Sequence, residues 1–62
     1  MTRIKINTKM ISQREDVVMR IGRFGEVVKV LKDNSFIFVV YHAENVAEVM
    51  QGLRGFTGEV VK

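Results

Sequence analysis

The spacing of the apolar residues switches along this chain between a period of two and a period of about 3.6, and this succession constrains the fold more than any other feature. Strict alternation over Arg3–Thr8 predicts a half-buried strand with Ile4 and Ile6 on one face. Ser12–Glu15 has the spacing of a capping box, and the apolar stripe behind it predicts a first helix that ends at Gly25. Within that helix, the i, i+4 spacing of an acidic and a basic residue predicts an ion pair, Asp16 with Arg20.

The second half of the chain predicts a hairpin, a second helix and a last strand. A β-branched stretch and an apolar run form the arms of the hairpin, and two residues that tolerate left-handed backbone form a tight turn between them. Helical spacing of apolar residues then predicts the second helix. In order, the predicted segments are strand Glu26–Lys32, turn Asp33–Asn34, strand Ser35–Tyr41, helix Glu44–Leu53, turn Thr57–Gly58 and strand Glu59–Lys62.

This β-α-β-β-α-β order predicts an α+β fold of the ferredoxin-like, split βαββαβ type. Two helices are expected on one face of a four-stranded antiparallel sheet, and residues 1–62 form one domain. The other face of the sheet is expected to be open, so we expect the function to lie there.

Composition narrows the functional classes. The chain has no cysteine and a single histidine, His42, so we expect no metal site and no cofactor. No nucleophile with a partner base and no convincing pair of carboxylates is visible, so we expect no enzyme. The first residues, MTRIKINTK, do not resemble a secretory signal, and the longest apolar run, FIFVVY, is only strand-sized. We therefore expect a cytoplasmic protein with no membrane partner. A chain of 62 residues is marginal as a monomer, which favours a homodimer.

The stretch NSFIFVVY, residues 34–41, resembles the strand-three motif of the RNA-recognition motif family. The matching positions are Phe36, Phe38, Val39 and Tyr41, and the wider similarity extends over residues 24–56. In that family the residues at the positions of Phe36 and Phe38 point away from the helices and stack on bases. The aromatic residue expected beside Phe38 on the first strand is here Lys5. The same region is similar to small bacterial proteins of the YlbG type, a likeness that implies a fold but no activity.

Two readings of the open sheet face follow. In the first, the chain binds single-stranded RNA or DNA, with phenylalanines stacking on bases and cations contacting phosphates. In the second, the chain is a homodimeric protein-interaction module, a regulator or inhibitor of a partner protein, that covers the same face and binds no nucleic acid; both central strands are apolar on both sides, as a covered sheet would require. Fold analogy alone adds a third reading, a metabolite held between subunits. The predicted binding residues are Arg3, Lys5, Asn7, Phe36, Phe38 and Val40.

Overall fold

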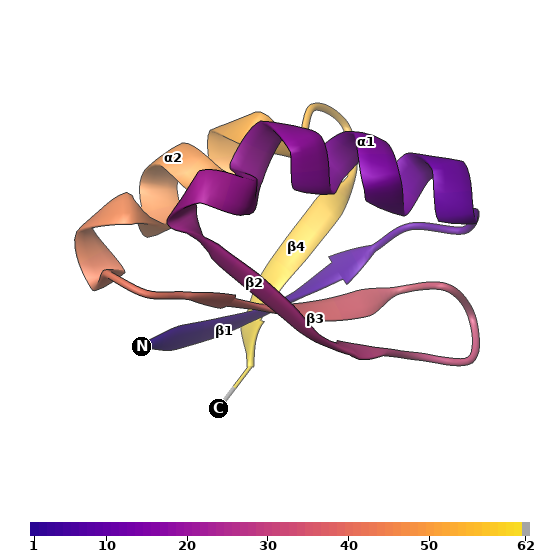
Figure 1. Ribbon diagram of the computed structural model, residues 1–62, viewed down its shortest axis with the longest axis horizontal. Helices are drawn as coiled ribbons and strands as arrows, with labels where there is room; N and C mark the ends of the chain where they lie inside the picture. Colours follow the sequence, from indigo (N-terminus) through magenta and orange to yellow (C-terminus); the bar gives the residue numbers. More distant parts are fainter. Residues whose placement is uncertain (62) are drawn as a thin grey trace.

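The computed structural model describes residues 1–61 and places two helices on one side of a curved four-stranded sheet (Figure 1). The α+β, ferredoxin-like arrangement predicted from the sequence is confirmed. The strands are β1 (Thr2–Asn7), β2 (Gly25–Val30), β3 (Phe36–Val40) and β4 (Thr57–Val61). The helices are α1 (Ile11–Ile21) and α2 (Val46–Gly52), with 3₁₀ turns η1 (Gly22–Phe24) and η2 (Ala43–Asn45).

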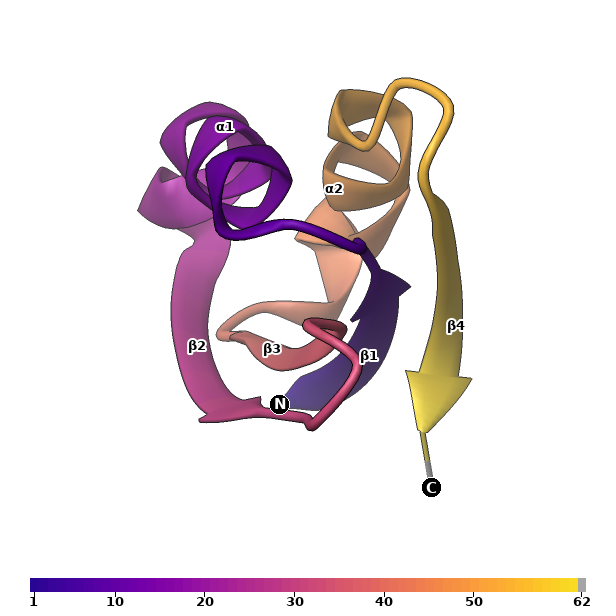
Figure 2. The same cartoon turned by 90° about the vertical axis from the view of Figure 1, so that its right-hand side faces the viewer.

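The strand order in the sheet is β2-β3-β1-β4, and every neighbouring pair is antiparallel. The two central strands, β1 and β3, are therefore flanked by β2 and β4 as the edges. Figure 2 shows β2 beneath α1 on one side of the molecule and β4 beside α2 on the other. The register between the central strands places Ile4 opposite Phe38 and Ile6 opposite Phe36.

The start of α1 differs from the prediction. The helix begins at Ile11 after Met10, so Ser12 lies inside it and does not cap it. Instead, the side-chain oxygen of Gln13 accepts a hydrogen bond from the backbone N–H of Lys9, at 2.8 Å. The predicted capping box lies two residues too late in the sequence, because Gln13 takes the reciprocal role that the sequence pattern gave to Glu15.

Gly25 is not the stop of the first helix but the first residue of β2, because α1 ends at Ile21 and continues only as η1. A glycine is needed there for packing. A Cβ atom at Gly25 would lie 1.8 Å from the backbone oxygen of Val39 and 2.9 Å from the Phe38 ring. The main chain of β2 thus approaches β3 more closely than any side chain would allow.

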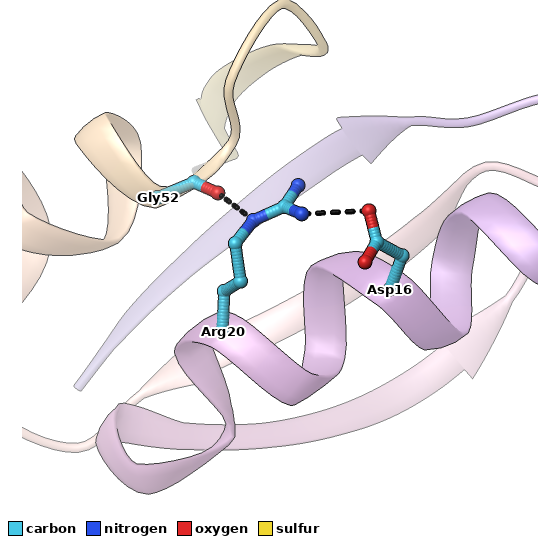
Figure 3. Close-up of polar contacts among 3 residues, drawn as sticks. All are labelled: Asp16, Arg20 and Gly52. Atoms are coloured by element: carbon cyan, nitrogen blue, oxygen red, sulfur yellow. Dashed lines mark hydrogen bonds and ion pairs between the residues drawn. The ribbon is translucent and has the colours of Figure 1, made fainter.

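The two helices also approach each other closely, at Gly52. A Cβ atom there would lie 2.8 Å from Cγ2 of Ile21. Arg20 joins the helices beside this point: its Nε donates to the Gly52 carbonyl at 2.8 Å, and its Nη1 meets Asp16 at 2.6 Å (Figure 3). The predicted i, i+4 pair is confirmed, and it holds the guanidinium in place for the contact between helices.

The β2–β3 connection is a three-residue loop, not the two-residue turn that was predicted. The Leu31 N–H donates to the Ser35 carbonyl at 2.8 Å, and the Asn34 N–H donates to the Leu31 carbonyl at 3.1 Å. Asn34 has φ of 68° and thus supplies the left-handed residue that such a loop requires. Its carbonyl accepts the hydroxyl of Thr8 at 2.6 Å, so the loop is tied to the end of β1.

The predicted turn at Thr57 and Gly58 is also wrong, since both residues belong to β4. The chain reverses earlier, where the Phe56 N–H donates to the Leu53 carbonyl at 3.3 Å and Gly55 takes φ of 95°. The last residue of the predicted strand, Lys62, lies outside the described residues.

One apolar core lies between the sheet and the helices. Buried side chains from the central strands meet buried side chains from both helices there. Its members are Ile4, Ile6, Val17, Ile21, Phe36, Phe38, Val40, Val49 and Leu53.

Candidate functional site: the open sheet face and the β2 edge

The two phenylalanines that were predicted to stack on bases face the helices. Phe36 and Phe38 are both 0% exposed, and Val40, the third apolar residue assigned to the binding face, is buried with them. The prediction that these three residues stand on the open face is therefore wrong. They are the largest contribution of β3 to the core.

The register of the sheet explains this orientation. Phe38 stands opposite Ile4 and Phe36 opposite Ile6, and residues opposite each other in an antiparallel pair point to the same face. Burying the isoleucines of β1 therefore buries the phenylalanines too. The opposite phase would have placed Ile37 and Val39 beneath the helices, and these carry less apolar area than two phenylalanines.

Arg3 and Lys5 do lie on the open face, as predicted. Their neighbours there are not aromatic: Arg3 stands opposite Val39, and Lys5 stands opposite Ile37. On its other side, Lys5 is opposite Glu59 of β4, so the cation has a carboxylate as its cross-strand neighbour. The open face combines a small aliphatic strip with charges of both signs.

Asn7, the last of the predicted binding residues, is engaged within the chain. Its side-chain amide donates to the hydroxyl of Thr57 at 2.9 Å, across the β1–β4 pair. Its role in this structure is to join the start of β4 to the end of β1. The six predicted residues thus divide into two groups, and the sheet keeps the cations apart from the aromatic rings.

The edge strand β2 carries a feature that the sequence reasoning missed. The pairing with β3 shifts between Val27 and Lys29, so Val28 is an extra residue in a β-bulge. Val28 is 51% exposed and Val30 is 47% exposed, which is unusual for valines on one strand of so small a domain. The apolar character of Glu26–Lys32 on both faces was the signal in the sequence.

A groove runs between β2 and α1 beside these valines. Its volume is about 520 Å³, and its lining is mostly apolar. Met19, on its helical wall, is 86% exposed. Met19 lies off the apolar stripe of α1, which is how the sequence could have marked it. The lining residues are Arg14, Glu15, Val18, Met19, Val27 and Val30.

The β2–β3 loop holds a carboxylate whose acidity is altered by its surroundings. The Ser35 hydroxyl and backbone N–H both donate to the Asp33 carboxylate, and these hydrogen bonds lower the pKa of Asp33 from its ordinary value of 3.8. Asp33 stabilises the loop in this way and adjoins no cavity described above.

Over residues 1–61, no group of three or more histidine, cysteine, aspartate or glutamate side chains is placed to hold a metal ion. Within the same range, neither helix has the length and apolar character needed to cross a membrane.

Comparison with known proteins adds no assignment, because no family model, curated protein or solved structure matches the chain significantly.

Proposed function

We propose that this chain is a non-enzymatic protein-interaction module that binds through the side of the molecule formed by β2 and α1. The observation that carries the proposal is the exposed apolar surface on that side. We call it the β2–α1 surface and define it by Met19, Val27, Val28 and Val30 together with the groove between them.

Edge position strengthens this proposal. Val28 and Val30 lie on a strand whose outer backbone groups have no neighbouring strand in the sheet, and an edge of this kind can accept an added strand. The adjoining groove would take apolar side chains from the same partner. Backbone pairing would supply affinity, and the groove would supply selectivity.

The nucleic-acid reading keeps its two cations but loses its two stacking residues. Base stacking needs exposed aromatic faces, and both phenylalanines are buried. Arg3, Lys5 and Lys29 share the open face with Glu26 and Glu59, so the cations that would contact phosphates lie among carboxylates that would repel them. A protein partner is therefore the better-supported class.

Site-specific photo-crosslinking in the cells that produce the protein tests the proposal. A benzophenone amino acid replaces Val30 in one variant and Glu48, an exposed position on α2, in a matched control. We expect a protein adduct from position 30 and none from position 48, with the adduct identified by mass spectrometry. If position 30 yields no protein adduct, or yields only nucleic acid, the proposal is wrong.

A further inference from the structure

We infer that the occupant of the β2–α1 surface is a second copy of this chain, joined to the first by antiparallel pairing of β2 with β2 about a two-fold axis between Val27 and Val28. This inference rests on the proposed function and names its partner. It makes the protein a homodimer with a sheet that continues from one copy into the other.

The bulge in β2 places two opposite charges on the same face of the sheet. Glu26 stands opposite Val39 and Lys29 stands opposite Ile37, and both of these β3 residues belong to the open face. In a regular strand, residues three positions apart point to opposite faces. The extra residue in the bulge removes that difference, so Glu26 and Lys29 share the open face.

This shared face produces charge complementarity between two copies. An axis between Val27 and Val28 places Glu26 of one copy directly opposite Lys29 of the second copy, and symmetry repeats the pair. Opposite charges in such cross-strand positions stabilise a sheet, and like charges destabilise it. A lysine and a bulge usually protect an edge from pairing. In this register Lys29 pairs with Glu26 of the other copy, and the bulge is what brings these two residues onto one face.

The backbone groups fit the same register. Leu31 and Phe24 bond to β3, through the Leu31 N–H to the Ser35 carbonyl and the Tyr41 N–H to the Phe24 carbonyl. Because bonded positions alternate along an antiparallel strand, Val30 and Gly25 aim their backbone groups away from β3. The proposed axis sets Gly25 of one copy opposite Val30 of the other, so the groups that point outward meet.

The second edge strand, β4, also carries an exposed valine, Val60, but its five residues include no basic side chain to oppose Glu59. The pairing of β4 with β1 is regular, so residues on one face of β4 are two positions apart. An axis through Glu59, the middle residue of β4, would set two glutamates opposite each other. Charge therefore favours β2 over β4 as the joining edge.

The helix side of the interface completes the fit. Because α1 lies over β2 in each copy, joining the strands brings the two α1 helices to the same side of the extended sheet (Figure 2). Met19 of each copy would then stand beside the groove of the other, and methionine adapts well to an irregular apolar groove. A standard interface removes about 800 Å² per partner, which is about a fifth of the 4273 Å² surface of this chain.

Charge reversal tests the inference. We expect the wild-type protein to sediment as a dimer, and Glu26→Lys or Lys29→Glu alone to raise the dimer dissociation constant about tenfold or more, because each sets two like-charge pairs opposite each other. The double variant Glu26→Lys/Lys29→Glu should restore the wild-type constant. A matched control reverses Lys5 and Glu59, the cross-strand neighbours on the same face but within one copy, and should leave the mass unchanged. Circular dichroism checks that every variant folds.

Each outcome decides the inference. A wild-type protein that stays monomeric up to about 1 mM overturns it, since that concentration corresponds to an association free energy of only about 4 kcal/mol. The inference is also overturned if neither single reversal changes the dimer dissociation constant, or if the double reversal does not restore the wild-type constant. A monomer whose photo-crosslinker at position 30 captures a different protein would leave the proposed function standing and remove only the second copy as its partner.

Discussion

Ile4 and Phe38 stand opposite each other on the central strands β1 and β3, and both are fully buried beneath the helices. The orientation of this pair determines which side chains lie on each face of the two central strands. With Phe38 buried in the core, the strands leave aliphatic, polar and charged side chains on the open face. Exposed valines lie instead on the two edge strands, Val28 and Val30 on β2 and Val60 on β4.

Replacing Phe38 should therefore destabilise the fold without altering the residues of the proposed binding surface. We expect Phe38→Ala to lower the free energy of unfolding by about 3–5 kcal/mol, the usual cost of removing a buried phenylalanine. The control Arg3→Ala, at an exposed position on the open face, should change it by less than about 0.5 kcal/mol. Urea denaturation followed by circular dichroism measures both. A Phe38→Ala protein of normal stability would contradict the burial of that ring.

Gly25 should not tolerate a side chain. The Cβ of Gly25→Ala would meet the Val39 carbonyl and the Phe38 ring, so we expect a loss of about 3 kcal/mol, at the upper end for overpacking. Gly22→Ala is the matched control, because its Cβ would meet only Val18 at 3.9 Å and its φ of −59° suits alanine. That variant should be neutral or about 0.5 kcal/mol more stable. Thermal unfolding that ranks the two alanines the other way would refute the close approach of β2 to β3.

Arg20 should matter more than its ion-pair partner. Arg20→Ala removes the hydrogen bond to the Gly52 carbonyl that joins the helices, and a bond from a charged donor contributes about 1.5–3 kcal/mol. Asp16→Ala removes only the half-exposed i, i+4 pair, worth about 0.3–0.5 kcal/mol. Chemical denaturation of both variants gives the comparison. Equal losses would mean that Arg20 acts through Asp16 alone.

The contact between Asp33 and Ser35 should make stability depend on acid. Because hydrogen bonds lower the pKa of Asp33 in the folded chain, their contribution is present above the unfolded pKa and disappears as the pH falls through the folded value. The stability difference between wild type and Asp33→Asn should therefore be largest near neutral pH and shrink below about pH 4. Unfolding midpoints measured across that range test this. A difference that stays constant with pH would show that the carboxylate charge has no part in the loop.

Local patterns in the sequence were sufficient for the order of the elements. Alternation around Ile4 and Ile6 predicted β1 and its buried face, and helical spacing predicted both helices. These signals are local, because the period of the apolar residues reflects the geometry of a single element. The predicted ends of the elements were less accurate where a turn depends on contacts with residues distant in the sequence. The turn at Asn34 is an example, because its carbonyl accepts a hydrogen bond from the Thr8 hydroxyl.

The sequence by itself determined that this chain is an α+β domain with β1 half buried and two helices against one side of the sheet. Only the tertiary structure decided which side of β3 is buried, because that strand is apolar on both faces and its period is the same in either phase. The register with β1 chose the phase by placing Phe36 and Phe38 opposite two buried isoleucines. The bulge that brings Glu26 and Lys29 onto one face was likewise invisible in the sequence, since it exists only in the pairing of β2 with β3.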